Sequence, residues 1–468
     1  MFVLKVFAAI LAFIIQVQLS GLLGIDGYGS FSLILSVANV ISIFPLLGMD
    51  SGLIREVASA SSLGVRKWYA LVSFLCSFAL LIFLGILMLP IFPYIAKVLS
   101  LPADMLLLLM SYLVLLVFNT LAGAFLQGEQ RNVFNDGTLV LTLIGKLFCI
   151  YWLGIIGAGL QDVLFAYIFL EFICTVGRWS NIVFRYRHMN IERQPLVDVK
   201  RYLLYCIPLF FVSSIGIVQC SLHRFVTAFF MDNYNVGILR VCENFSAGLA
   251  LFVAPFVTTW PLMAAYYKEA RLDDIRKMFE ESSVIITMLI MPALTFILVC
   301  APELFQLFHL SVLDNPTLIT VLFIFCLGTV YDAIIGPAGA LLKMTEYSRV
   351  AFYNSAILLV LTIIFSYVLI PMFGLIGAAS ALSLSHFVIN TMNAYQNYRF
   401  FKLMPYGRRQ IELILFAVPV AGMLLYLREK VIFTPFLNII IYGISIYFIF
   451  MIWAYIRNPV LFKKTIKR

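Results

Sequence analysis

Long apolar stretches and short polar stretches alternate along the whole chain. A helix needs about 20 predominantly apolar residues to cross the hydrocarbon core of a bilayer. About fourteen stretches of roughly this length follow one another, so the pattern predicts an all-α polytopic membrane protein. The expected spans are 2–24, 29–52, 68–95, 104–127, 135–156, 160–184, 202–230, 235–263, 282–306, 316–342, 350–371, 375–399, 411–427 and 436–456.

The positive charges follow the same alternation. Most of the 32 Lys and Arg residues lie near the N-terminus, on the even-numbered loops or in the C-terminal tail. Only Lys97, Arg428 and Lys430 lie on odd-numbered loops. Because cytoplasmic loops collect Lys and Arg, we expect both termini to be cytoplasmic.

The composition excludes several other classes. A chain of 468 residues that is 63% hydrophobic and only 12% charged does not resemble a soluble protein. Its net charge of +9 is spread over short loops, which favours attraction to anionic lipid headgroups over nucleic-acid binding. The eight cysteines lie inside apolar spans, without the spacing of a zinc site or a disulfide framework. No phosphate-binding loop or hydrolase motif is present, so we expect no cofactor, no metal and no enzymatic activity.

The polar loops differ in length and character. The longest is 185–201, and the next, Tyr266–Glu281, has the pattern of a short surface helix. The odd-numbered loops are much shorter, and several contain only three or four residues. These short loops are 25–28, 157–159, 231–234 and 372–374.

Short motifs from the first half of the chain return about six spans later. The motif LGIIGAG at Leu153–Gly159 returns as FGLIGAA at Phe373–Ala379, and other matches keep the same order. Six spans per copy would leave the two halves in the same orientation, with a site between them near mid-membrane. We therefore expect an N-terminal half at 1–184, a cytoplasmic linker or hinge at 185–201 and a C-terminal half at 202–400. Residues 401–468 would add two helices and a basic tail.

Lys146 and Glu171 are charges inside expected spans. A charge at mid-bilayer costs about 2.5–3.5 kcal/mol on insertion scales, so each needs a reason. The two residues lie about 12 positions on either side of the turn at 157–159, which places both near mid-membrane on adjacent helices. A cavity cation with a protonatable partner and a structural ion pair both fit, and we favour the structural pair.

Arg224 and Arg240 each lie eight residues from Asp232 and therefore share a depth, roughly 12 Å from the membrane surface. Glu243 follows Arg240 by three residues, so those two side chains can pair on one helix face. No acidic residue stands three or four positions from Arg224. Since a guanidinium can give two donors to one phosphate, Arg224 is the best candidate for a phosphate contact. The alternative is that Arg224 snorkels to the periplasmic headgroups.

Arg178 and Asp332 complete the set of charges. Arg178 lies within two turns of a cytoplasmic loop, so we favour snorkelling over a place in the cavity. Asp332, a lone acid in the middle of its span, is either a proton or sodium site or the partner of a cation on another span, and we favour the partner role. Uncharged polar residues inside spans fit a sugar pathway, although ordinary interhelical hydrogen bonding is favoured for each. These residues are Gln16, Gln18, Asn39, Gln219, His223, Asn244 and Asn390.

Four stretches and the repeated motif carry a resemblance to Wzx-type polysaccharide flippases. These flippases belong to a superfamily with the peptidoglycan lipid flippases and the multidrug MATE exporters. The resemblance covers nearly the whole chain, through glycine and apolar patterns. The four stretches are Leu22–Leu33, Leu46–Ser59, Leu121–Arg131 and His223–Val241, and the repeated G-x-I-G-A motif stands at 154–158 and 374–378.

The resemblance implies that the protein flips an undecaprenyl-pyrophosphate-linked oligosaccharide across the bacterial inner membrane, for O-antigen, capsule or similar polysaccharide. It implies membrane lipids, a polysaccharide polymerase and a chain-length regulator as further partners. Two positions depart from the family. Gly21 stands near a position that is commonly basic, and His223 stands at a position that is often acidic.

Two other functions remain as alternatives to the flippase. A membrane polysaccharide polymerase or ligase should have a large basic periplasmic loop, and a MATE-like exporter should have acidic residues in its cavity. The short, cation-poor odd loops and the basic excess inside spans count against both. The substrate-binding candidates are Arg224, Arg240, Lys146 and Arg178, and the ion-coupling or ion-pair candidates are Glu171, Glu243 and Asp332.

Overall fold

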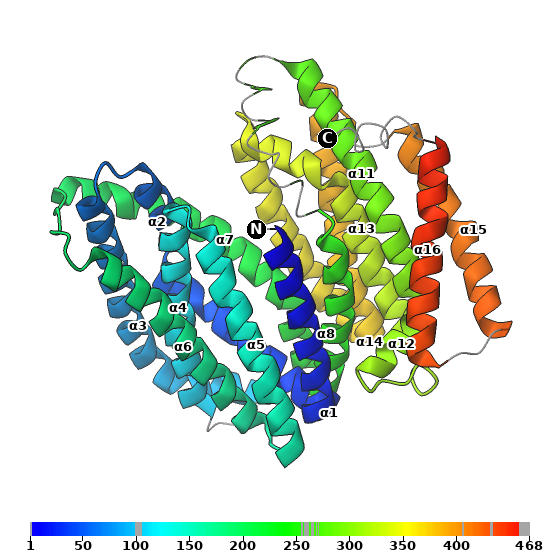
Figure 1. The fold of residues 1–468 in the computed structure, drawn as a ribbon, viewed down its shortest axis with the longest axis horizontal. Coiled ribbons are helices and arrows are strands. Elements are labelled where there is room, and N and C mark those ends of the chain that lie inside the picture. The colour runs from blue at the N-terminus through cyan, green and yellow to red at the C-terminus, as the bar shows by residue number, and fades with distance from the viewer. Residues whose placement is uncertain are drawn as a thin grey trace. The chain divides into compact units, whose positions relative to one another are not determined.

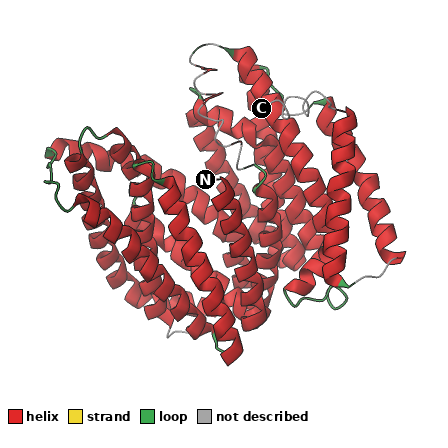
Figure 2. Cartoon of the chain, in the orientation of Figure 1, coloured by secondary structure: helices red, strands yellow, loops and turns green. Residues whose placement is uncertain are grey.

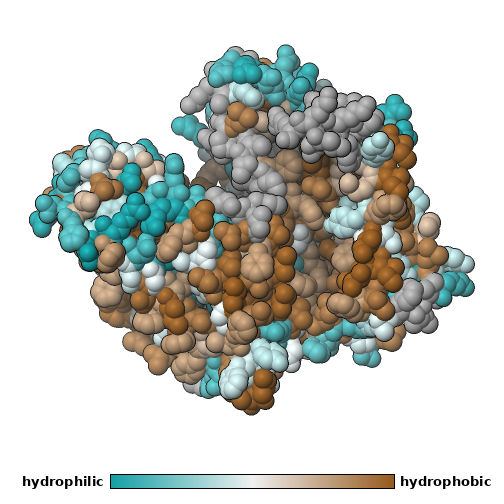
Figure 3. Space-filling view, in the orientation of Figure 1, coloured by the Kyte–Doolittle hydropathy of each residue, from teal (hydrophilic) through white to brown (hydrophobic). Residues whose placement is uncertain are grey.

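The structure is a computed structural model. In the residues that it describes, the regular elements are helices (Figure 2), and 11 of them are long and apolar enough to cross a membrane. Apolar side chains cover the middle of the helices and hydrophilic side chains gather near their ends (Figure 3), as a bilayer requires. The predicted all-α polytopic fold is therefore confirmed. The described residues are 2–98, 105–253, 256, 262–263, 266–267, 269, 271–404, 407–430 and 434–457.

Two of the long helices are broken at a glycine, so each covers two of the expected spans. Helix α1 (Phe2–Leu46) breaks at Gly24, where φ is 67°, and α14 (Ser348–Phe401) breaks at Gly374, where φ is 57°. Residues with a Cβ rarely adopt such positive φ angles, which explains why glycine stands at both breaks. The prediction of short loops at 25–28 and 372–374 is therefore wrong, because the helix resumes directly after one glycine in each case. Asn354 Nδ2 lies 2.6 Å from Gln396 Oε1, so the two parts of α14 lie against each other.

The chain forms two compact units, Met1–Ile238 and Leu239–Arg468. In the first unit (blue to green in Figure 1), α4 packs against α2 and α6, and α1 packs against α5 and α7. Helix α7 also packs against α2, although the repeat had assigned this helix to the second half. The division into two six-helix halves stays a prediction. The helices after α1 in this unit are α2 (Met49–Ser59), α3 (Leu63–Val98), α4 (Leu106–Gly128), α5 (Asn132–Ile156), α6 (Leu160–Tyr186) and α7 (Leu196–Phe230).

The expected linker is shorter than predicted and is bonded to its neighbours, because α6 and α7 extend into 185–201. Lys67 Nζ, in the first turn of α3, donates to the carbonyl oxygens of Tyr186 and Met189, each at 3.0 Å. Ser62 Oγ donates to Glu192 Oε2 at 2.6 Å. These bonds hold the loop against the start of α3 within the first unit.

Helix α8 (Asn233–Ala250) begins in the first unit and continues into the second, where α13 packs along α14 and α11 packs against α13, α15 and α16. The expected short surface helix at 266–281 is not a separate element: from residue 272 its polar residues form the first turns of α11, which continues without a break into an apolar segment. Part of the expected eighth span and the basic tail at 458–468 lie outside the described residues. The other helices of this unit are α11 (Leu272–Val299), α12 (Ala301–Leu307), α13 (Thr317–Met344), α15 (Arg408–Lys430) and α16 (Pro435–Arg457).

A buried carboxylate joins the last two helices to α12. Glu303 Oε1 accepts hydrogen bonds from Arg428 Nε at 3.1 Å and Nη2 at 3.0 Å, and from Asn438 Nδ2 at 2.8 Å. The Glu303 side chain is only 5% exposed. Arg428, which the sequence placed on a loop, lies in the last turn of α15. The pair therefore fixes the ends of α15 and α16 against α12.

We expect Arg428→Leu to destabilise the protein by about 3 kcal/mol, because it leaves the Glu303 carboxylate buried without its cation. The matched control is Arg408→Leu, which removes an ion pair with Glu412 from a side chain that is 92% exposed. That change should cost less than about 1 kcal/mol. Thermal unfolding of the detergent-solubilised variants measures both, and equal shifts for the two would contradict the buried role of Arg428.

Candidate functional site

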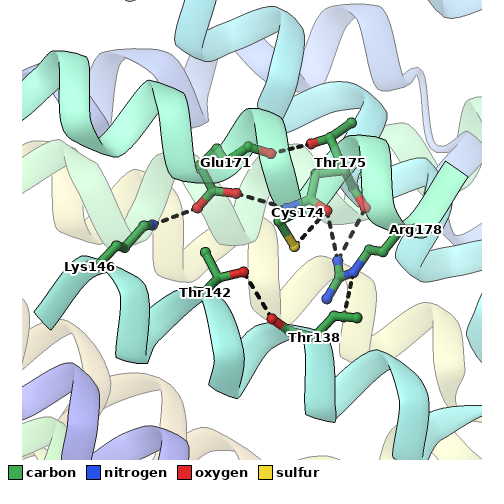
Figure 4. Close-up of polar contacts among 8 residues, drawn as sticks. Thr138, Thr142, Lys146, Glu171, Cys174, Thr175 and Arg178 are labelled. Atoms are coloured by element: carbon green, nitrogen blue, oxygen red, sulfur yellow. Dashed lines mark hydrogen bonds and ion pairs between the residues drawn. The ribbon is translucent and has the colours of Figure 1, made fainter. Parts of the chain in front are cut away.

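Lys146 and Glu171 face each other inside the first unit (Figure 4). Lys146 lies on α5 and Glu171 on α6, and Lys146 Nζ is 2.6 Å from Glu171 Oε1. Their side chains are 8% and 15% exposed. The tight turn at Gly157, where φ is 66°, brings α5 and α6 together at matching depth. This is the contact that counting residues from the turn predicted.

The pair belongs to a larger hydrogen-bond network that includes Arg178. Glu171 Oε2 accepts from Asn119 Nδ2 at 2.9 Å, and Asn119 Oδ1 accepts from Arg178 Nη1 at 2.8 Å. Arg178 Nε donates to Thr138 Oγ1 at 2.9 Å, and Nη2 donates to the carbonyl oxygen of Asn135 at 3.0 Å. The network therefore joins α4, α5 and α6 through two cations and one carboxylate.

The position of Arg178 corrects the sequence analysis. We favoured snorkelling toward the cytoplasmic surface, but Arg178 is buried and its guanidinium bonds to acceptors on α4 and α5 (Figure 4). Interior oxygens satisfy its donors, so the side chain has no need to extend to water. The substrate-binding roles of Lys146 and Arg178 stay predictions, and either role would require the network to open.

Sequence reasoning missed the neutral members of this network. Thr138, Thr142 and Lys146 are spaced four residues apart, which places them on one face of α5. That polar stripe in an apolar helix was a usable signal. The ring of Tyr167 lies 4.2 Å from Lys146 Nζ and meets Phe31 of α1 edge to face at 5.0 Å. Aromatic contacts thus link the network to α1, and apolar composition alone gave no sign of them.

Arg224, on α7, extends along its helix toward the preceding turn and bonds to α1. Its Nη1 donates to Ser36 Oγ on α1 at 2.6 Å, and its Nη2 donates to the carbonyl oxygen of Cys220 at 2.7 Å. Cys220 lies one turn further from the α7–α8 turn at Met231. The guanidinium therefore lies on the side of Arg224 that faces away from this turn, and both the phosphate contact and the snorkelling alternative for Arg224 stay predictions. Ser36, which helps to set this orientation, was missed in the sequence.

Arg240 and Glu243 meet on one face of α8. Arg240 Nη1 lies 3.1 Å from Glu243 Oε2, as their spacing of three residues predicted. The Arg240 side chain is 31% exposed. The use of Arg240 as a second donor to a substrate stays a prediction.

A cavity of about 90 Å³ lies within the second unit, between α8, α13 and α14. Two acids and a histidine, Glu243, Asp332 and His386, are among its lining residues. Asp332 Oδ1 accepts from Asn390 Nδ2 at 2.8 Å and lies 3.5 Å from His386 Nδ1. Its side chain is 49% exposed. Asp332 therefore lines the cavity and lies beside a histidine on another span, and its role as a cation partner or as an ion site stays a prediction. Among the described residues, no group of three or more His, Cys, Asp or Glu is placed to hold a metal ion.

The sequence profile of a family described as polysaccharide biosynthesis protein matches residues 1–267. No curated protein matches the chain. Three solved structures share the fold at low identity. The inward closed lipid II flippase MurJ is 15% identical, with a TM-score of 0.78, over 97% of this chain and 98% of its own. An inward-facing multidrug resistance MATE family transporter of the MOP superfamily is 16% identical, with a TM-score of 0.65, over 84% and 94%.

A MOP superfamily transporter from Pyrococcus furiosus is 16% identical, with a TM-score of 0.62, over 86% of this chain and 93% of its own. The chain thus shares its fold with these three solved structures. The family profile covers more than half of the 468 residues, so the chain belongs to the polysaccharide biosynthesis protein family.

Proposed function

We propose that this protein flips an undecaprenyl-pyrophosphate-linked oligosaccharide repeat unit across the bacterial inner membrane. The product would feed the synthesis of O-antigen, capsule or a similar surface polysaccharide. Membership of the polysaccharide biosynthesis family and a fold shared with a lipid II flippase support a transporter rather than a catalyst. The sugar headgroup and pyrophosphate of such a lipid cannot cross hydrocarbon unaided, whereas its polyprenyl tail can stay in the bilayer.

The observation that carries the proposal is the contact of Arg224, on α7, with Ser36 on α1. A cation held at this place between two apolar helices would offer a partner for the anionic pyrophosphate of this substrate. Ser36 and the Cys220 carbonyl hold the guanidinium in place, so little side-chain entropy remains to be lost on binding. The planar fork can give two donors to phosphate oxygens. Arg240 would act as a second donor when Glu243 releases it.

No ATP-binding motif is present in the sequence, so the energy for transport would come from an ion gradient, the membrane potential or downstream removal of the product. Asp332 is our candidate for ion coupling, since it faces a cavity and lies beside His386. Glu171, bonded to both Lys146 and Asn119, would keep the first unit in one arrangement. Membrane lipids, a polysaccharide polymerase and a chain-length regulator would be its partners in the cell.

A second candidate function is the export of cationic small molecules. Glu243 and Asp332 both line the cavity of the second unit, and carboxylates would suit a cationic cargo. Deletion of the gene separates the two functions. The flippase proposal expects loss of surface polysaccharide and accumulation of lipid-linked repeat units. An exporter would instead leave the polysaccharide intact and make the deleted cells sensitive to cationic drugs.

Membrane topology gives a separate prediction, because the charge alternation places both termini in the cytoplasm. A reporter enzyme fused at each loop shows by its activity whether that loop lies in the cytoplasm or in the periplasm. A cytoplasmic reading at Asn233 would contradict both the proposed orientation and the repeat. We expect cytoplasmic readings after Ser59, Arg193 and Glu280, and periplasmic readings at Gly159, Asn233 and Asn315.

A further inference from the structure

Side-chain amides in the second unit form a chain of hydrogen bonds that ends on Asp332. Gln396 Nε2 donates to Asn354 Oδ1 at 3.2 Å, and Asn354 Nδ2 donates to Asn393 Oδ1 at 2.7 Å. Asn393 Nδ2 donates to Asn390 Oδ1 at 3.4 Å, and Asn390 Nδ2 donates to Asp332 Oδ1 at 2.8 Å. We call Gln396, Asn354, Asn393 and Asn390 the amide relay.

The direction of the amide relay follows from the chemistry of its end. An ionised carboxylate only accepts hydrogen bonds, so Asn390 must turn its NH₂ group toward Asp332. The amide oxygen of Asn390 then faces Asn393, which must also present its NH₂ group. The same requirement passes on to Asn354, whose NH₂ group donates to Asn393 Oδ1 at 2.7 Å. That NH₂ group also donates to Gln396 Oε1 at 2.6 Å, so the Asn354–Gln396 pair at the end of the relay is bonded in both directions. Each bond polarises the next, so a negative charge on Asp332 strengthens the whole chain.

The amide relay extends along α14 from Asp332 toward the C-terminal end of that helix. Asn390 and Asn393 lie on the second part of α14, near the depth of Asp332 on α13. Gln396 lies about 9 Å further along that helix than Asn390, toward its C-terminal end. There it pairs with Asn354, near the start of the first part of α14. Asn354 and Asn390 are each only 3% exposed, whereas Asn393 and Gln396 are half-buried.

We propose that the amide relay links the charge of Asp332 to the contact between the two ends of α14. While Asp332 is ionised, the relay holds the two parts of that helix together, and when Asp332 is neutralised this contact weakens. The proposal rests on the proposed function in one respect: Asp332 is taken as the group whose charge changes during transport. His386, on the cavity wall, and Lys343, further along α13, also act on Asp332, and Glu243 lines the same cavity. None of these three belongs to the relay, so its effect can be separated from theirs.

The consequence is a change in bond strength rather than in fold. Hydrogen bonds to charged groups are stronger than those between neutral groups. A neutral residue at position 332 therefore weakens the chain without removing its acceptor oxygen. The ends of α14 would then open more often, and their backbone amides would exchange hydrogen faster.

Hydrogen exchange of the full chain in lipid nanodiscs tests this, without substrate. We expect Asp332→Asn to speed exchange about fivefold in peptides covering 350–357 and 394–401. Asn393→Leu should speed the same peptides, because it removes a link that does not touch Asp332. In the Asn393→Leu background the relay is already broken, so adding Asp332→Asn should not increase the exchange rate of these peptides further. Asn354→Val, which breaks the next link, should remove the effect of Asp332→Asn in the same way.

Thr391→Val is the matched control, because Thr391 lies on the same helix but bonds to Tyr331 instead of the relay. It should leave the effect of Asp332→Asn intact. Peptides from α16 should exchange alike in all variants, which shows that they are folded. Unchanged exchange in Asp332→Asn overturns the proposal, as does equal acceleration in the presence of Asn393→Leu. Because no transport is measured, these outcomes are independent of whether the protein flips lipid.

Discussion

Arg224→Ala should abolish surface polysaccharide in cells while leaving the amount of protein in the membrane unchanged. In the proposed mechanism the guanidinium meets the pyrophosphate of the lipid-linked substrate within the membrane, where such bonds are strong. Loss of one hydrogen bond to a charged group corresponds to at least about a tenfold loss of affinity, and this residue supplies two. Polysaccharide in flippase-deleted cells, measured beside membrane abundance, gives the result.

The companion variants of Arg224 separate charge from geometry. Arg224→Lys should restore only part of the export, because an ammonium keeps the charge but loses the planar fork. Ser36→Ala, which removes the hydroxyl that orients Nη1, should have an intermediate effect. Arg240→Ala should be milder than Arg224→Ala or reduce folding, since Arg240 pairs with Glu243. Full export by a well-expressed Arg224→Ala protein would remove Arg224 from the site.

Lys146 and Glu171 should show strong energetic coupling in a double-mutant cycle. Glu171→Ala leaves the Lys146 ammonium buried without its carboxylate, a change that typically costs about 3–5 kcal/mol. Lys146→Ala should cost less, because Asn119 still donates to Glu171. The double variant buries neither charge, so it should recover part of the loss. Thermal unfolding in detergent measures all three, with polysaccharide export as a second readout.

A nearby change serves as control for that cycle. Thr142 lies on the same face of α5, and its hydroxyl bonds only to the carbonyl oxygen of Thr138 in the contacts found around it. Thr142→Val should therefore shift stability little, alone or combined with Glu171→Ala. Strictly additive losses for Lys146→Ala and Glu171→Ala would contradict their coupling.

The membrane-spanning pattern was readable from the sequence because the bilayer imposes it. A crossing helix must be apolar over about 20 residues, and the alternation of charge does not depend on packing. Depth was also readable for Lys146 and Glu171, since residues can be counted from a tight turn at a fixed rise. Arg240 and Glu243 met as expected because their spacing alone places them on one helix face.

Contacts between helices that are distant in sequence were not readable in this way. Snorkelling was favoured for Arg178 because its depth was known, while its acceptors on α4 and α5 were not. The amide relay joins Asn354 to Asn393 across the break at Gly374, and the sequence offered Asn390 only as an isolated polar residue. The breaks themselves were taken for loops, since composition does not reveal that one glycine with positive φ can replace several loop residues.

The most direct test of the proposed function is lipid flipping by the purified protein. Vesicles would hold an undecaprenyl-pyrophosphate-linked oligosaccharide in both leaflets, and an external enzyme that modifies the sugar would report on its accessibility. With protein present, we predict that the initially protected lipid becomes modified, and that Arg224→Ala vesicles behave like protein-free ones. If the protected lipid stays protected in vesicles with a folded, correctly inserted protein, the flippase proposal is wrong.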